Sequence, residues 1–261
     1  CLKHPFSLLG NVWMGEEILE KQNKKHVFCI SGPTASGKTA IAYYLSENLK
    51  SSSKSSPKSN LSLSDNHNIC DLISVDSAMV YRGLNIGAAK PSADELLRYP
   101  HKLVDIRNPE DIYSVGEFYN DAISAIKASF AAGRQPILVG GTMMYYNSLL
   151  NGLAQIPGKD DNIRKQIESE AEATGWDALH KELVKCDPVA AVAIHPNDSQ
   201  RITRALEVFR LTNKPISSFW DEQQINKQQN NIVDWDYVMI GLDLDRAILH
   251  KRIEMRFDKM I

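Results

Sequence analysis

The chain has 261 residues, of which 43% are hydrophobic, enough for one large domain or for a core with an appended lobe. Its formal net charge of -2 excludes attraction of polyanions by the molecule as a whole, so a polyanionic partner needs a local basic patch. No apolar run approaches the roughly 20 residues that span a bilayer, and the four widely spaced cysteines include no CxxC pair, so we expect reduced thiols and a cytoplasmic protein with no membrane partner.

The first predicted strand, residues 26–31, leads directly into a phosphate-binding loop. The loop reads GPTASGKT, and a helix-forming run begins at Lys38. The two glycines let the backbone curl, so that successive N–H groups and the helix dipole converge on one anion. Lys38 supplies a charge between terminal phosphates, and Thr39 offers a hydroxyl ligand to Mg²⁺. We therefore predict a polyphosphate site made by Gly32, Pro33, Thr34, Ala35, Ser36, Gly37, Lys38 and Thr39.

A Ser/Lys-rich stretch, residues 50–69, follows the first helix and is predicted to be a flexible surface insertion without chemistry. The next predicted strand, residues 70–75, ends at Asp76, at the edge where parallel sheets bind ligands. In a phosphotransferase such an acid would hold Mg²⁺ or accept a hydroxyl proton. The alternative is that Asp76 only caps the following turn.

The next two predicted strands are residues 102–106 and 136–140. Between them, Ser114 and Glu117 form a capping box for a helix that is predicted to end near a glycine at position 133. The second of these strands ends in two glycines and Thr142, where an ordinary Walker B strand would carry an acid. This favours close backbone approach and neutral donors to a phosphate over a typical ATPase site. A structural turn with a capping threonine is the alternative.

Helical periodicity dominates residues 160–212, before a last predicted strand at 236–242 and a last helix at 245–260. Strands that alternate with helices predict an α/β fold, namely a P-loop NTPase-like doubly wound parallel sheet with an inserted small helical lobe. We predict the core at 26–150, the lobe at 151–213 and a return to the core at 214–261. Because no C-cap signal precedes Ile261, we expect the natural protein to continue.

Six segments resemble the tRNA dimethylallyltransferases of bacterial type, also called tRNA isopentenyltransferases. They occur in the family's order across most of the chain, and together they are far more specific than a P-loop alone. The Ser-rich insertion and the end at Ile261 depart from the family pattern. The segments are GPTASGKT (32–39), SVDSAMVYRGLNIGAAKP (74–91), PHKLVDIRNPEDIYSVGEF (100–118), VGGTMMYY (139–146), HPNDSQRITRALEV (195–208) and RIEMRF (252–257).

The resemblance implies transfer of a dimethylallyl group from dimethylallyl diphosphate to the N6 amine of the adenosine adjacent to the tRNA anticodon, with release of diphosphate. An exocyclic adenine amine is a poor nucleophile, because its lone pair is delocalised into the ring. A carboxylate must take its proton, and Asp76 is the predicted general base. By family analogy, Thr142 bonds the leaving diphosphate and Arg256 contacts it from the last helix. Mg²⁺ at Thr39 is the expected cofactor.

The tRNA contacts are predicted in two places, and a monomer is expected. Residues at the end of the second strand should line the flipped adenine, because an N6 atom in the anticodon-loop stack is otherwise inaccessible. Family analogy assigns a second segment to tRNA, whereas the sequence alone would leave its two arginines as a surface pair. The two sets are Asp76, Ser77, Ala78 and Met79, and Gln200, Arg201, Ile202, Thr203 and Arg204.

Three other functions are open at this point. A small-molecule kinase would share the P-loop and the strand-end acid but would consume ATP. An adenylate prenyltransferase would act on free AMP, ADP or ATP, and the helical lobe with its HPNDSQRITRALEV segment favours tRNA over these acceptors. A non-catalytic RNA-binding module gives no reason for a complete P-loop beside Asp76.

Overall fold

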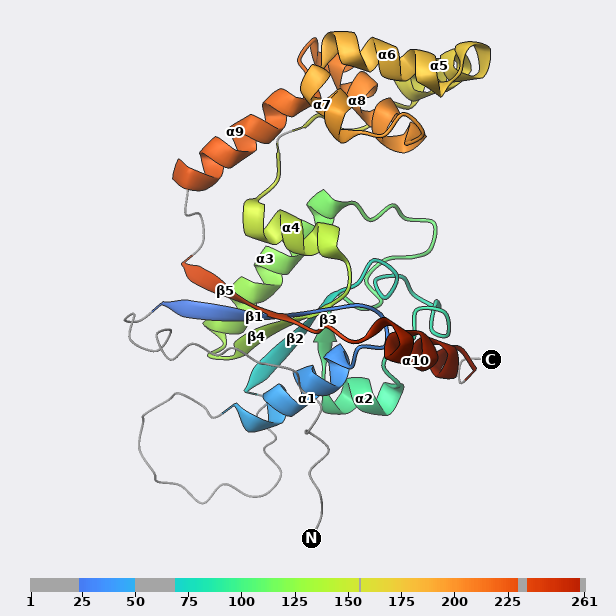
Figure 1. Ribbon diagram of the computed structural model, residues 1–261. Helices are drawn as coiled ribbons and strands as arrows, with labels where there is room; N and C mark the ends of the chain where they lie inside the picture. The colour runs from blue at the N-terminus through green and yellow to red at the C-terminus, as the bar shows by residue number, and fades with distance from the viewer. Residues whose placement is uncertain (1–23, 50–68, 155, 230–233, 259–261) are drawn as a thin grey trace, which may run out of the picture.

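The computed structural model describes residues 24–49, 69–154, 156–229 and 234–258, so the predicted 50–69 insertion lies outside the described residues except for its last position. A five-stranded sheet with the order β3-β2-β4-β1-β5 forms the centre of the molecule (Figure 1). Every neighbouring pair is parallel. The strands are β1 (Lys25–Ser31), β2 (Cys70–Val75), β3 (His101–Lys102), β4 (Gln135–Gly140) and β5 (Trp235–Gly241).

Helices cover both faces of the sheet, which is the predicted doubly wound architecture. In Figure 1, α3 and α4 lie above the sheet, α1 and α2 lie below it, and α10 follows β5 at the carboxyl edge of the strands. Parallel strands that are buried on both faces read as nearly continuous apolar runs, as β2 and β4 do here. These helices are α1 (Lys38–Asn48), α2 (Ala93–Arg98), α3 (Val115–Ala131), α4 (Met143–Asn151) and α10 (Arg246–Asp258).

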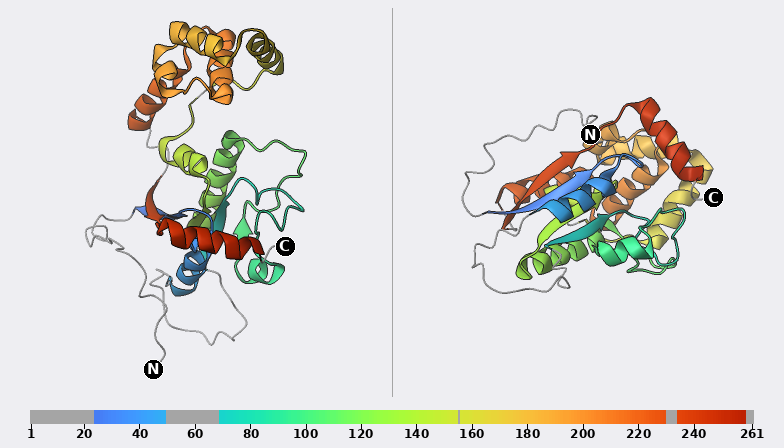
Figure 2. Two further views of the ribbon diagram at one scale, coloured as in Figure 1. Left: turned by 45° about the vertical axis from the view of Figure 1, so that its right-hand side comes forward. Right: turned by 90° about the horizontal axis from the view of Figure 1, so that it is seen from below.

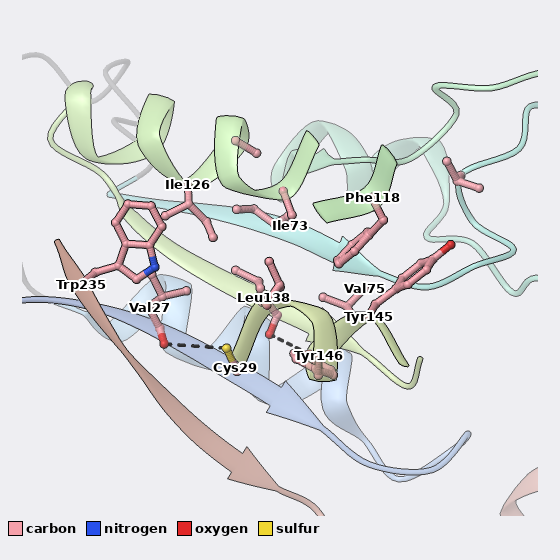
Figure 3. Packing of buried hydrophobic residues seen from close by; sticks show 14 of the residues in the cluster. Val27, Cys29, Ile73, Val75, Phe118, Ile126, Leu138, Tyr145, Tyr146 and Trp235 are labelled. Atoms are coloured by element: carbon pink, nitrogen blue, oxygen red, sulfur yellow. Dashed lines mark hydrogen bonds between the residues drawn. The ribbon is translucent and has the colours of Figure 1, made fainter. Parts of the chain in front are cut away.

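Alternate strand residues build two cores. On the α3 and α4 face, strand residues such as Leu138 pack against Phe118, Ile126 and Tyr146 (Figure 3). The buried Tyr146 hydroxyl donates to the Ile30 carbonyl at 2.9 Å, which fixes α4 to the sheet. A second apolar cluster fills the face under α1. The thiols of the cysteines at positions 29, 70 and 186 are free, as expected.

The capping box predicted for α3 is confirmed. Ser114 Oγ accepts from the Glu117 N–H at 3.2 Å, and Glu117 Oε2 accepts from the Ser114 N–H at 2.8 Å. The helix ends at Ala131, and Gly133 follows with φ 68°, a conformation that glycine adopts without strain.

The predicted strand at 102–106 is wrong for most of its length. Only His101–Lys102 pairs with β2, because Leu103 (φ 64°) and Asp105 (φ 56°) adopt left-handed backbone conformations that no strand can contain. Two helices also went unpredicted, α2 and a long helix just before β5.

Residues 161–229 form a helical lobe with an apolar core of its own. Within the lobe, Gly175, with φ 85°, separates two helices, and Asp187 and Asp198 cap the helices that follow them. Figures 1 and 2 show the lobe on the same side of the sheet as α3 and α4. Its helices are α5 (Asp161–Thr174), α6 (Trp176–Cys186), α7 (Pro188–Ala193), α8 (Ser199–Thr212) and α9 (Ile216–Gln229).

The lobe was predicted to end at residue 213, but its apolar core includes Ile216 and Phe219 of α9. The division of the chain into domains stays a prediction. Within the parts of the chain that the structure describes, no helix combines the length and the apolar character needed to cross a bilayer.

Candidate active site

The P-loop connects β1 to α1 at the carboxyl edge of the sheet. Gly37 precedes the helix with φ 96° and makes no side-chain cap, so the N–H groups of the first helical turn are left to a ligand. The buried Ser36 Oγ has no hydrogen-bond partner among the described residues. A Cβ on Gly32 would lie 2.8 Å from the Leu242 carbonyl oxygen, so only glycine fits there. The loop is therefore shaped to leave donors facing an anion.

A cavity of about 470 Å³ opens beside this loop. It is walled by the P-loop, the end of β2, the end of β4, the segment 87–91 and α10. The residues of the predicted site that line it are Thr34, Lys38, Thr39, Asp76, Ala78, Met79 and Arg256. The fold thus brings the P-loop and Arg256 of the last helix to one cavity, although they lie near opposite ends of the chain.

Lys38 lies between an acid and a second cation. Its Nζ donates to the Pro33 carbonyl at 2.6 Å. Burial lowers the pKa of Lys38, the positive charge of Arg256 lowers it further, and the charge of Asp76 raises it. Neither Lys38 nor Arg256 forms an ion pair with a carboxylate of the described residues. Two neighbouring, unpaired cations are suited to a polyanion.

Asp76 closes the turn after β2 through one of its two carboxylate oxygens, which is the structural alternative that the sequence left open. Its Oδ1 accepts from the N–H groups of Ala78 at 2.8 Å and Met79 at 3.2 Å, which closes the turn after β2. Within the described residues, Oδ2 makes no hydrogen bond. One oxygen therefore fixes the carboxylate, and the other makes no hydrogen bond to the described residues.

The end of β4 needs its glycines for close approach to neighbouring backbone. A Cβ on Gly140 would lie 2.0 Å from the Val75 carbonyl oxygen. Thr142 precedes α4 without capping it through its side chain. Instead, Thr142 Oγ1 accepts from the Ser77 N–H at 3.2 Å. Thr142 therefore holds the loop after β2, although neither it nor Ser77 belongs to the cavity wall.

The predicted residues of α8 lie in the lobe, apart from this cavity. Gln200 and Arg201 are exposed, and the Arg201 side chain, 71% exposed, lies 3.3 Å from Asp198. Ile202 is fully buried in the lobe core. Gln200 and Thr203 line a second hollow, between α5, α6 and α8. Of the five side chains, two are thus available on the surface.

The Arg204 side chain makes its hydrogen bonds within the lobe. It donates to Glu207 Oε2 at 2.6 Å and to the Pro157 carbonyl at 2.6 Å. Arg164 of α5 also binds the fully buried Glu207, at 2.9 Å. Burial alone would raise the pKa of Glu207, but the hydrogen bonds from Arg164 and Arg204 lower it to about 2. This cluster joins α5, α8 and the segment that enters the lobe.

Sequence reasoning missed several residues of the cavity wall. Tyr43 lines it from α1 and stacks on Tyr99 at 3.9 Å between ring centroids. Lys90 and His101 also line it. Both of these stand in segments quoted above for the family resemblance, which was the only signal for them in the sequence.

Comparisons with known proteins identify the family of this chain. The IPP transferase family model matches residues 79–261. A protein of Hahella chejuensis described as tRNA dimethylallyltransferase 2 is 49% identical over 243 residues, which are 89% of this chain and 67% of that protein.

Solved structures resemble the chain as well. The tRNA isopentenylpyrophosphate transferase of Bacillus halodurans is 36% identical with a TM-score of 0.52, and the match covers 91% of this chain and 66% of that one. A eukaryotic dimethylallyltransferase acting on tRNA is 26% identical with a TM-score of 0.65, over 90% of this chain and 52% of that one. The chain thus spans about two thirds of the bacterial relatives and about half of the eukaryotic one. The match of the family model over most of the chain and the 49% identity establish that this chain belongs to the IPP transferase family.

Proposed function

We propose that this chain transfers a dimethylallyl group from dimethylallyl diphosphate to the N6 amine of the adenosine adjacent to the anticodon of a tRNA, releasing diphosphate. The observation that carries the proposal is the single cavity in which Lys38, Asp76 and Arg256 meet. The names of the relatives, which specify dimethylallyl or isopentenyl transfer to tRNA, support the choice of donor and acceptor.

The donor's diphosphate would lie on the P-loop. Lys38, Arg256 and the N–H groups at the start of α1 would neutralise its charge as the bond to the allyl carbon breaks. The Ser36 hydroxyl, which has no other partner in the described residues, would add a donor. The contact of Thr142 with the leaving group stays a prediction from the family resemblance: its hydroxyl accepts from Ser77 and keeps its own proton, but Thr142 does not line the cavity.

The residues fit a divalent cation, and we propose Mg²⁺. The described residues contain no cluster of three or more His, Cys, Asp or Glu side chains for a metal. Mg²⁺ at phosphate sites uses few protein ligands and takes the rest from phosphates and water. Thr39, in the same cavity wall as Lys38, would provide the protein ligand. When bound, the cation would add positive charge against the leaving diphosphate.

Asp76 would act as the general base. As the new bond forms between N6 and the allyl carbon, the bond between that carbon and the diphosphate oxygen breaks, and the N6 proton passes to Asp76. The Oδ2 atom is the acceptor, because Oδ1 is held by the amides of Ala78 and Met79. A fixed carboxylate loses little freedom on reaching the transition state.

The helical lobe supports a tRNA acceptor over a free nucleotide. A nucleotide would fit within the cavity alone, whereas the exposed Gln200 and Arg201 lie outside it, on α8. An extended RNA could contact both the cavity and these exposed residues of α8. We also propose that the protein acts as a monomer in the cytoplasm, where tRNA is found.

The test is incubation of the protein with labelled dimethylallyl diphosphate and either tRNA or AMP. We expect the label in a tRNA adenosine next to the anticodon. Label on AMP alone would favour an adenylate prenyltransferase. In a parallel incubation with ATP, consumption of ATP, together with no prenyl product in the first test, would favour a kinase.

A further inference from the structure

We infer that Lys90 is a positioning residue for the proposed reaction: through Asp105 it holds the peptide that fixes the Asp76 carboxylate. The inference rests on the proposed function of Asp76 and adds the residues that hold Asp76 in place. Lys90 follows Ala89, whose backbone is left-handed (φ 46°), in the segment that forms one wall of the cavity.

The Lys90 ammonium group is buried and fully engaged. Its side chain is only 3% exposed, against 42% for Asp105. Nζ donates to the Tyr81 carbonyl, to Asp105 Oδ1 at 2.6 Å and to Asn85 Oδ1 at 3.4 Å. An ammonium group has three N–H donors, and three acceptors surround this one. Lys90 therefore has no donor to spare for a diphosphate, although it lines the cavity.

Asp105 connects Lys90 to Asp76, the proposed general base, through two hydrogen bonds of Met79. The Asp105 N–H donates to the Met79 carbonyl at 3.1 Å, and the Met79 N–H donates to Asp76 Oδ1 at 3.2 Å. Two further backbone bonds, from Ile106 and Arg107 to the Val80 carbonyl, run beside this connection. The segments 76–81 and 105–107 thus behave as one unit, and Lys90 is bonded to both.

The backbone of this unit needs an external contact. Leu103 and Asp105 adopt left-handed conformations, which are disfavoured for residues with a Cβ and persist only where surrounding contacts impose them. The Lys90–Asp105 ion pair is such a contact. Because Asp105 is 42% exposed, the pair is only partly buried, and such ion pairs add little net stability in general, which agrees with a role in geometry.

The test compares Lys90→Met with a matched control, Lys102→Met. Lys102 also has three acceptors, Asp71 at 2.8 Å, Ser129 Oγ at 3.0 Å and the Ala125 carbonyl at 3.2 Å, but it faces α3 and does not line the cavity. Both substitutions remove a partly or fully buried cation from a Lys–Asp pair. They differ in whether that pair is connected to Asp76.

The first measurement is the rate of prenyl transfer at saturating donor and tRNA, together with the donor Kd. Lys90→Met should lower the rate by about 10- to 100-fold, the cost of a misplaced catalytic group, while the donor Kd stays within about twofold. Lys102→Met should keep the rate within about twofold even if its melting temperature falls. Asp105→Asn should reproduce the Lys90→Met loss, and the double variant should be no slower than Lys90→Met, because both act through one contact.

The second measurement is hydrogen exchange at the Ala78 and Met79 amides, which needs no activity. Exchange there should accelerate in Lys90→Met and not in Lys102→Met. An unchanged rate and unchanged exchange in Lys90→Met would overturn the inference, as would a loss of donor affinity equal to the loss of rate. If the wild-type protein transfers no prenyl group, the proposed function fails on its own, and the exchange comparison still decides whether Lys90 holds this loop.

Discussion

Lys38 has a second cation beside it, and this sets the expected cost of its removal. Arg256 lines the same cavity, so Lys38→Ala should weaken donor binding without abolishing it. We expect the Kd for dimethylallyl diphosphate to rise by about 10- to 100-fold, the loss of one charged hydrogen bond. Isothermal calorimetry measures it, with Lys24→Ala as a control, because Lys24 pairs with Asp236 at the start of β1 and β5. If Lys38→Ala binds dimethylallyl diphosphate with unchanged affinity, the P-loop is not the binding site of the donor.

Asp76→Asn should separate catalysis from binding. The amide side chain can still accept from Ala78 and Met79, so the turn after β2 should persist, but it cannot take a proton. Turnover should fall by roughly 10² to 10⁴, with donor affinity nearly intact. Asp160→Asn, a helix cap of α5 with a similar pair of amide donors, should keep its turnover at saturating tRNA. If Asp76→Asn loses donor affinity and keeps its turnover, Asp76 is a metal ligand or a structural residue.

Elements that are determined locally could be predicted from the sequence, and those that depend on distant contacts could not. The P-loop and the Ser114 capping box are encoded within a few neighbouring residues. The early end of β3 is not, because nothing near Leu103 in the sequence favours a left-handed backbone. The contacts of Arg204 with the Pro157 carbonyl and of Lys90 with Asp105 could not be predicted for the same reason, since folding brings each pair together.

The α5–α8 contact should make the lobe sensitive to acid. The folded-state pKa of Glu207 is lowered to about 2, below the roughly 4.3 of an unfolded glutamate. Its ionisation therefore stabilises the lobe fully above pH 4.3, and this contribution is lost as pH falls from there towards 2. Urea unfolding followed by tryptophan fluorescence, which Trp176 and Trp220 report from within the lobe, should show this loss. Glu207→Gln should be less stable at neutral pH and lack this dependence, whereas an equal acid dependence in both proteins would contradict it.

At the scale of the whole molecule, the cavity and the exposed part of α8 belong to different bodies. The cavity lies at the carboxyl edge of the sheet, beside the P-loop. The lobe lies beyond α3 and α4 (Figures 1 and 2). Arg204 connects the segment before α5 to Glu207, so its loss would disturb the lobe itself. Among the described residues, the Arg201 side chain pairs only with Asp198, whose side chain is 33% exposed, and ion pairs at the surface contribute little to stability. Of the two arginines, Arg201 is therefore the one that can report on RNA binding.

We therefore expect Arg201→Ala to weaken tRNA binding and to leave the donor Kd unchanged. If Arg201 contacts one phosphate, the slope of log K against log salt should fall by about one unit, because one fewer counterion is released. Fluorescence anisotropy with labelled tRNA at several salt concentrations measures this slope. Lys185→Ala removes the same charge from the exposed surface of α6 and controls for net charge. An Arg201→Ala variant with wild-type affinity and slope would exclude a phosphate contact at Arg201. An equal change in both variants would indicate a long-range effect of charge instead.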